Sequence, residues 1–363
     1  MELAIKLDTS KDRSYKIVFT PDVSQEIEKF VQENAIKKVL FLTENTVWKF
    51  HGKELFGHLK DAENAQYYKY VFKAWEKNKN INTVLGVIDY LNSIKFNRND
   101  LIICFGWGVV WDLWGFLASM YKRGVNFIQI PTTLLSILDS SVWGKTGVDY
   151  AGIKNIIGAF NQPKVVLVNK DYLQTLPELQ IVSWYFEWLK HALLDSEKHF
   201  DSFCTLFDSM ISLKEVPDEV LFSNIRIKAD VVMRDEEEKW ERKKLNYWHT
   251  FGHAIESLNN YKLPHGVCVW YGIIFANIVS HNLWYLDESL MNWINTFIIK
   301  IIRKYTLKDS RFDEINKMML NDKKNNTQKV KFTLLQNIWN IHFIEVDRKD
   351  LEKAYNEFLY FIS

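Results

Sequence analysis

The amino-acid sequence predicts an α/β domain built on a parallel sheet, followed by a mostly α-helical domain. Three observations predict this. The chain has 363 residues, a length that suits two domains. Short apolar runs alternate with helically spaced segments in the first half, and helical spacing dominates the second half. We place the α/β domain at residues 1–172 and the helical domain at residues 173–363.

Four short apolar runs in the first half are interpreted as buried strands, and two longer segments have the apolar spacing of helices. Alternation of this kind implies parallel strands joined by right-handed crossovers, which places ligands at the carboxyl ends of the strands. The expected strands are Lys38–Leu42, Leu101–Phe105, Phe127–Ile130 and Val165–Val168, and the expected helices are Asn82–Ile94 and Val110–Tyr121.

After about Leu173 the pattern becomes helical, with one late strand. Residues 306–326 are polar and include a lysine cluster, Lys323–Lys324. We expect the functional site in the cleft between the two domains. The expected helices are Ser183–Leu194, Pro217–Arg234, Tyr247–Asn259 and Gly266–Trp284, and the expected strand is Val330–Leu335.

Composition narrows the classes of function. The formal net charge is +1, which argues against nucleic acid as a partner. No apolar run is long enough for a membrane span, and the first residues lack a signal-peptide layout, so we expect a cytoplasmic protein without a membrane partner. The three cysteines are widely spaced and indicate neither a disulfide framework nor a zinc knuckle.

The histidines of the second half are the candidate metal ligands. His249 and His253 in HTFGH are four residues apart and share one face of a helix. His265 follows twelve residues later, and Glu187 lies on an earlier helix. Two histidines and a carboxylate with one open position form a catalytic set of the zinc type. An HxxxH pair alone is more often structural, so the surrounding residues must decide.

Those surroundings contain many cations and a candidate nucleotide turn. Lys145 in WGKTG and Lys154 in IKNIIG lie among small residues and amides, in loops that can hold a phosphate or a carboxylate. After Leu101–Phe105 the sequence reads GWG, with Asp112 close behind. A glycine turn between a strand and a helix lets the helix N-terminus face a pyrophosphate. This turn departs from GxGxxG and is weak evidence by itself.

The motifs VNFIQIPTTLL, DSSV…GKTGV, KNIIGAFNQP, HTFGHAIES and LPHG resemble those of the 3-dehydroquinate synthase family, within the sugar-phosphate cyclases. The resemblance extends over nearly the whole chain. It implies a Rossmann-like NAD domain, a helical domain that binds metal and substrate, and a homodimer. Its metal ligands, for Zn²⁺ or Co²⁺, would be Glu187, His249 and His265.

The resemblance also implies residues for the cofactor and for a phosphorylated sugar-acid substrate. Glu44 stands where the family usually has an aspartate. The NAD contacts would be Glu44, Glu76, Lys79, Gly106, Gly108, Val109, Asp112, Thr132, Thr133, Lys145, Lys154 and Thr175. The catalytic and substrate residues would be Arg123, Asp139, Lys145, Asn155, Lys190, Lys228, Arg242, Asn246 and His253, with Lys154 and one of Lys323 or Lys324 in addition.

The chemistry implied is conversion of a heptulosonate phosphate to 3-dehydroquinate in the shikimate pathway. NAD⁺ takes a hydride and later returns it, phosphate leaves by elimination, and an internal aldol step closes the ring. A substrate that carries both a phosphate and a carboxylate accounts for the many cations.

The chain departs from the family in its tryptophans, several of which stand where the family has glycine. It has as many tryptophans as glycines, 14 of each. An indole should block a turn that brings backbone close to phosphate. We hypothesise that the codons for the tryptophans at family glycine positions are UGA, which the host reads as glycine. The family has glycine at the positions of Trp75, Trp107, Trp111, Trp143, Trp184, Trp240, Trp248 and Trp339.

Three alternatives remain open at this point. The alternatives to an active 3-dehydroquinate synthase are an inactive homologue with a blocked cofactor turn, another sugar-phosphate cyclase, and a metal-dependent polyol dehydrogenase. Lys228, Arg242 and Asn246 disfavour another cyclase. A polyol dehydrogenase would need no dense set of cations and would release NADH. A further departure is Val267, where the family usually has glutamate after His-Gly, which would weaken support of His265.

Overall fold

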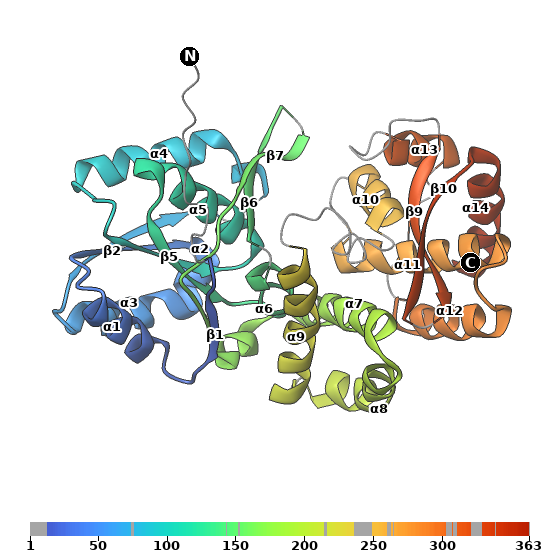
Figure 1. Cartoon of the computed structure of the whole chain (residues 1–363), viewed down its shortest axis with the longest axis horizontal. Coiled ribbons are helices and arrows are strands. Elements are labelled where there is room, and N and C mark those ends of the chain that lie inside the picture. Colours follow the sequence, from blue (N-terminus) through green and yellow to red (C-terminus); the bar gives the residue numbers. More distant parts are fainter. Residues whose placement is uncertain are drawn as a thin grey trace, which may run out of the picture. The chain divides into compact units, whose positions relative to one another are not determined.

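The computed structural model describes residues 13–73, 76–142, 144–151, 153–213, 216–235, 249–259, 263, 265–302, 307, 311–320, 329–337 and 339–362. Within these ranges, the side chains at 76, 141, 178, 179, 182–184, 208–213, 249 and 265 are not described. The chain divides into two compact units, Met1–Leu176 and Pro177–Ser363. Figure 1 shows the elements of both.

The first unit is built on a six-stranded sheet in which every neighbouring pair is parallel. The strand order is β1-β8-β5-β4-β2-β3. All four strands expected from the sequence belong to this sheet, which confirms its parallel character. The strands are β1 (Lys16–Phe19), β2 (Lys38–Glu44), β3 (Gln66–Phe72), β4 (Leu101–Gly106), β5 (Asn126–Pro131) and β8 (Val165–Val168).

Helices cover both faces of this sheet, as Figure 1 shows. Leu40 and Leu42 of β2 pack into a core with α4 and α5, whereas Val39 and Phe41 of the same strand pack into a core with α1 and α3. Successive side chains of a strand point to opposite faces, so a sheet covered on both sides needs continuous apolar runs. The helices are α1 (Val23–Glu33), α2 (Asn45–Val47), α3 (Lys53–Asp61), α4 (Ile81–Ser93), α5 (Gly108–Met120) and α6 (Leu134–Leu138).

An antiparallel hairpin, β6 (Lys145–Tyr150) and β7 (Ile153–Phe160), extends from this unit. It forms a sheet of its own, and β6 packs against α5. The apolar runs did not predict this hairpin because most of β7 is exposed. Gly147 and Gly158 face each other across the hairpin, and a Cβ on Gly158 would lie 2.6 Å from the Thr146 carbonyl oxygen.

The second unit is mostly helical. Each of the four expected helices is present within a few residues of its expected bounds, and the late strand is present and pairs with β10. The elements are α7 (Glu178–Asp195), α8 (Glu197–Leu213), α9 (Asp218–Arg234), α10 (His249–Leu258), α11 (His265–Asn282), α12 (Glu288–Ile302), α13 (Phe312–Leu320), β9 (Val330–Asn337), β10 (Asn340–Val346) and α14 (Arg348–Ile362).

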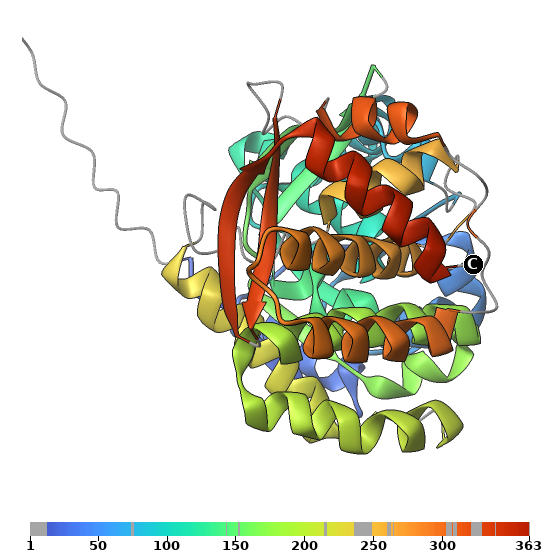
Figure 2. The same cartoon turned by 90° about the vertical axis from the view of Figure 1, so that its right-hand side faces the viewer.

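Helix α11 is the centre of this unit, and its residues are buried on every side from Gly266 to Ser280. It contacts α7, α10, α12, α14 and β9. Figure 2 shows α11 beside the β9–β10 hairpin, with α12 below it. A helix that is apolar all round belongs in the core of a domain. No helix in the part of the chain that the structure describes is long and apolar enough to cross a membrane.

Candidate functional site

The predicted nucleotide turn joins β4 to α5. Gly106 ends β4, and a Cβ there would lie 2.6 Å from Cγ2 of Val110, so the turn requires glycine. Trp107 is the N-cap residue of α5 and adopts an extended conformation with φ −119°. Its half-buried ring packs against the cores on both faces of the sheet. The backbone at residue 107 therefore accepts a side chain without strain.

Two predicted cofactor residues, Lys79 and Asp112, form an ion pair in this region. The Lys79 side chain is buried, and that of Asp112 is partly exposed. Lys79 follows a short 3₁₀ turn (Glu76–Asn78), whereas Asp112 lies in the first turns of α5. The Lys79 carbonyl oxygen accepts a hydrogen bond from the Asp149 backbone N–H at 2.8 Å, which ties this loop to β6.

The predicted threonines follow β5 and differ in their hydrogen bonding. Thr132 is buried, and its backbone N–H donates to the Gly106 carbonyl at 3.0 Å, which places it beside the turn. Its Oγ1 has no hydrogen-bond partner among the described residues. Thr133 caps α6, because its Oγ1 accepts from the Ser136 N–H at 3.1 Å. Buried hydroxyls without a partner are uncommon in native proteins, so the Thr132 hydroxyl is available to bind a ligand.

Glu44 and Thr175 have hydrogen-bond partners that sequence reasoning did not predict. Glu44 ends β2, and its carboxylate oxygens accept from the backbone N–H groups of Thr46 and Val47, both at 2.7 Å. This buried carboxylate therefore caps α2. Thr175 Oγ1 lies 2.8 Å from Nε2 of His51. Desolvation by burial lowers the pKa of His51, and Glu54 opposes the shift.

The other candidates of the first unit are distributed around the turn and the hairpin. Val109 is buried in α5, and Asp139 is the C-cap residue of α6. Lys145 begins β6 and is half-buried, whereas Lys154 and Asn155 lie exposed in β7. Arg123 is exposed after α5, and the side chain of Glu76 is outside the described residues.

Three of the predicted metal and substrate residues of the second unit are buried, on helices α7 and α9. Glu187 and Lys190 lie on α7 and form an ion pair, with both side chains buried. Lys228 on α9 is fully buried. An uncompensated buried charge is very costly, so these charges require partners in the protein or in a ligand.

The two predicted histidine ligands begin neighbouring helices. His249 is the first residue of α10, and His265 is the first residue of α11. These helices pack against each other, and α11 also packs against α7, which carries Glu187. The side chains of both histidines are outside the described residues, as are Arg242, Asn246, Lys323 and Lys324. His253, one turn into α10, is exposed.

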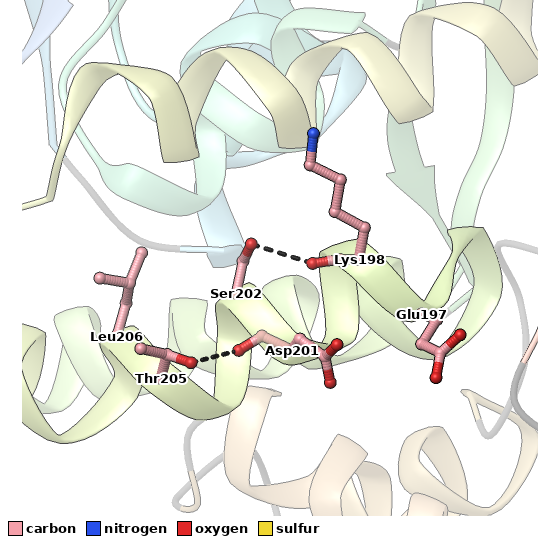
Figure 3. A pocket seen from close by; sticks show the side chains of 6 residues that line it. All are labelled: Glu197, Lys198, Asp201, Ser202, Thr205 and Leu206. Carbon is pink, nitrogen blue, oxygen red and sulfur yellow. Dashed lines mark hydrogen bonds between the residues drawn. The ribbon is translucent and has the colours of Figure 1, made fainter.

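An open depression on α8, shown in Figure 3, is a separate feature. It contains no residue predicted for the site. Two of its hydroxyls bond to their own helix, since Ser202 Oγ donates to the Lys198 carbonyl and Thr205 Oγ1 donates to the Asp201 carbonyl. This depression is therefore not assigned to the chemistry. It is lined by Glu197, Lys198, Asp201, Ser202, Thr205 and Leu206.

Some of the described tryptophans occupy unfavourable positions, which are of two kinds. Trp111 and Trp114 are buried in α5, and their indole N–H groups find no acceptor in the described part of the chain. Trp339, in the β9–β10 turn, and Trp284, just after α11, have φ values of 61° and 63°. Glycine adopts this left-handed conformation most readily. Sequence reasoning missed Trp284, which only the backbone geometry reveals.

Comparison with known families and curated proteins gives matches over most of the chain. The family model for the 3-dehydroquinate synthase N-terminal domain matches residues 69–183, and that for the C-terminal domain matches residues 185–325. A 3-dehydroquinate synthase from Acetivibrio thermocellus is 37% identical over 96% of this chain and 98% of its own length. One from Staphylococcus haemolyticus is 35% identical over 96% and 97%.

Solved structures share the fold at lower identity. A 2-epi-5-epi-valiolone synthase from Streptomyces hygroscopicus, solved with NAD⁺ and Zn²⁺, has a TM-score of 0.86 at 21% identity, covering 98% of this chain and 99% of its own. A 2-deoxy-scyllo-inosose synthase, solved with carbaglucose-6-phosphate, NAD⁺ and Co²⁺, has a TM-score of 0.81 at 20% identity, covering 94% and 96%. Glycerol dehydrogenase from Schizosaccharomyces pombe reaches 0.66 at 15% identity, covering 98% and 93%.

Proposed function

Because the chain belongs to the 3-dehydroquinate synthase family, we propose that it converts 3-deoxy-D-arabino-heptulosonate 7-phosphate to 3-dehydroquinate and phosphate. The observation that carries the proposal is the 37% identity with a 3-dehydroquinate synthase over 96% of this chain. The chain is then a phosphorus–oxygen lyase of the shikimate pathway, which leads to chorismate and the aromatic amino acids. Its cofactors are NAD⁺ and one divalent metal ion, Zn²⁺ or Co²⁺.

The residues of the first unit fit a dinucleotide at the carboxyl ends of β4 and β5. When bound, NAD⁺ accepts a hydride from the substrate and returns it, so the cofactor is regenerated. The Thr132 hydroxyl is buried without a partner among the described residues, beside the Gly106 turn. We assign it a hydrogen bond to the cofactor. Lys79 and Asp112 supply a charged pair beside the same helix.

The residues of the second unit fit a metal ion and an anionic substrate. A divalent metal ion polarises substrate hydroxyls and lowers their pKa. Glu187, His249 and His265 would hold it, because two imidazoles and a carboxylate form a suitable donor set. Buried ammonium groups bind phosphate or carboxylate strongly, and Lys190 and Lys228 are both buried.

The remaining predicted residues bind and position the substrate. Arg242, Asn246 and His253 complete the set in the second unit, and His253 with Asn246 would position proton transfers. Lys145, Lys154 and one of Lys323 or Lys324 would add positive charge for the phosphate and carboxylate. The phosphate's own oxygen is the candidate base for its elimination.

The test is release of phosphate from the heptulosonate phosphate by the purified chain, supplied with Zn²⁺ or Co²⁺ and NAD⁺. We expect phosphate in proportion to substrate consumed, with no accumulation of NADH. Stoichiometric NADH without phosphate would support a polyol dehydrogenase instead. Absence of both products, together with absence of NAD⁺ binding, would support an inactive homologue.

The second candidate function, an inactive homologue, requires that the protein really contains tryptophan at the family glycine positions. We propose instead that the host reads the codons at these positions as glycine. Left-handed Trp339 supports this proposal, and so does Trp111, whose buried indole N–H has no acceptor among the described residues. The extended conformation of Trp107 gives no support from backbone strain. The gene's codons test it, because UGG at these positions would contradict the proposal. Glycine masses at residues 107 and 111 in peptides from the native host would establish it.

We propose a homodimer in the cytoplasm, with a small phosphorylated sugar acid as the substrate. Light scattering after size-exclusion chromatography measures the assembly. A mass close to 43.1 kDa, the mass of one chain, would contradict the dimer.

A further inference from the structure

A hydrogen bond between two fully buried polar side chains joins α7 to α9. His191 Nδ1 of α7 lies 3.0 Å from Oδ1 of Asn224 in α9. Neither side chain has measurable exposure to solvent. Asn224 Nδ2 donates to the Val220 carbonyl at 2.8 Å, so the amide oxygen is the atom that faces the histidine. His191 Nδ1 therefore carries the proton and donates it to Asn224.

This pair lies one helical turn from predicted site residues on both helices. Glu187 precedes His191 by four residues, and Lys228 follows Asn224 by four residues. Residues four apart lie on the same face of a helix. Each helix therefore presents one predicted site residue and one member of the pair on a single face.

A third helix joins the same buried junction. His199 of α8 accepts a hydrogen bond at Nε2 from the Trp188 indole N–H at 3.1 Å. Burial lowers the pKa of His199, against smaller opposing effects of Asp195 and of a hydrogen bond with Asn224. Because Nε2 accepts the indole hydrogen bond, the His199 imidazole is neutral, with its proton on Nδ1. Asn224 thus lies where α7, α8 and α9 meet.

We propose that the His191–Asn224 hydrogen bond is a positioning element of the active site, holding α7 and α9 in the register that brings Glu187 and Lys228 to the substrate. The inference rests on the proposed function. A slide of one helix along the other would leave both buried groups unpaired, so a single register is favoured. Catalytic groups need such precision, because a displacement of about 1 Å costs on the order of 100-fold in rate.

The experiment compares Asn224→Leu with a matched variant, Asn277→Leu. Asn277 of α11 is fully buried and donates to Asn295 of α12 at 2.9 Å. It lies more than three turns from His265. Both variants remove one amide from one buried interhelical hydrogen bond, so both should lower Tm.

Only Asn224→Leu should alter the site. We expect its kcat/KM to fall about 10- to 100-fold, and Zn²⁺ binding by the metal-free protein to weaken about tenfold. Both quantities should stay within about twofold in Asn277→Leu, measured well below either Tm. Zn²⁺ affinity is read by competition with a chromogenic chelator, without turnover.

A conservative variant provides the rescue. Asn overlays its Nδ2 on the position of histidine Nδ1, so His191→Asn should keep kcat/KM close to the parent value, whereas His191→Leu should reproduce the loss in Asn224→Leu. Equal kcat/KM and Zn²⁺ affinity in Asn224→Leu and Asn277→Leu would overturn the inference. If the parent chain neither binds Zn²⁺ nor releases phosphate, the proposed function itself fails.

Discussion

Replacing Thr132 by valine tests the assignment of the cofactor site with two readouts of opposite sign. Thr132 Oγ1 is buried beside the Gly106 turn, without a hydrogen-bond partner among the described residues. Valine keeps the shape and removes the hydroxyl. A buried polar group without a partner costs about 1–3 kcal/mol, so the cofactor-free protein should become more stable by about 1 kcal/mol. This corresponds to a rise in Tm of about 2–4 °C for a unit of this size.

The affinity for NAD⁺ should change in the other direction. A single neutral hydrogen bond contributes about 0.5–1.5 kcal/mol, so loss of the hydroxyl should raise the Kd by about 2- to 12-fold. Urea unfolding measures the stability, and calorimetric titration measures the Kd. Thr43→Val is the control, because Thr43 Oγ1 is also buried and lacks a partner in the described region, yet Thr43 is not a predicted cofactor contact. A Thr132→Val protein that is less stable and binds NAD⁺ unchanged would refute the reasoning.

Three further predictions concern stability. Trp284→Gly should raise the free energy of unfolding in urea by about 0.5 kcal/mol, because Trp284 has a left-handed backbone and its side chain, 93% exposed, contributes little packing. Trp293→Gly within α12 should lower it by about 3 kcal/mol, because glycine is unfavourable inside a helix and the ring is partly buried. The same sign for both variants would contradict the backbone argument. Lys190→Met leaves the buried Glu187 carboxylate without its ion pair, so the metal-free protein should lose about 3 kcal/mol, and saturating Zn²⁺ should restore part of it. Burial lowers the pKa of His199 below its usual 6.5, so the stability that it contributes is complete above pH 6.5 and is lost as the pH falls through the lowered value. His199→Gln should therefore make the free energy of unfolding in urea less dependent on pH below 6.5, and an unchanged dependence would count against this prediction.

The parallel sheet was predictable because its central strands are buried on both faces. Val39–Leu42 and Leu101–Phe105 are continuous apolar runs for that reason, and such runs are visible without any knowledge of their neighbours. The strand Gln66–Phe72 was missed because it is an edge strand, and its exposed and half-buried residues follow no apolar run.

The contacts of the candidate cofactor residues could not be predicted from the sequence. The resemblance supplied the residue types, but spacing alone could not pair Lys79 with Asp112, which are 33 positions apart and meet only through the fold. Glu44 was expected to contact the cofactor, and its hydrogen bonds to Thr46 and Val47 became visible only once the end of β2 was defined.

The sequence by itself determined the class of the fold and the family, because apolar periodicity and short motifs are local properties of the chain. Only the tertiary structure decided which distant polar groups meet. His191 and Asn224 are 33 residues apart and carry no motif, yet they form a buried hydrogen bond between two helices. The physical reason is that the energy of a buried polar group depends on its partner, and the partner is fixed by helix packing, which no local pattern encodes.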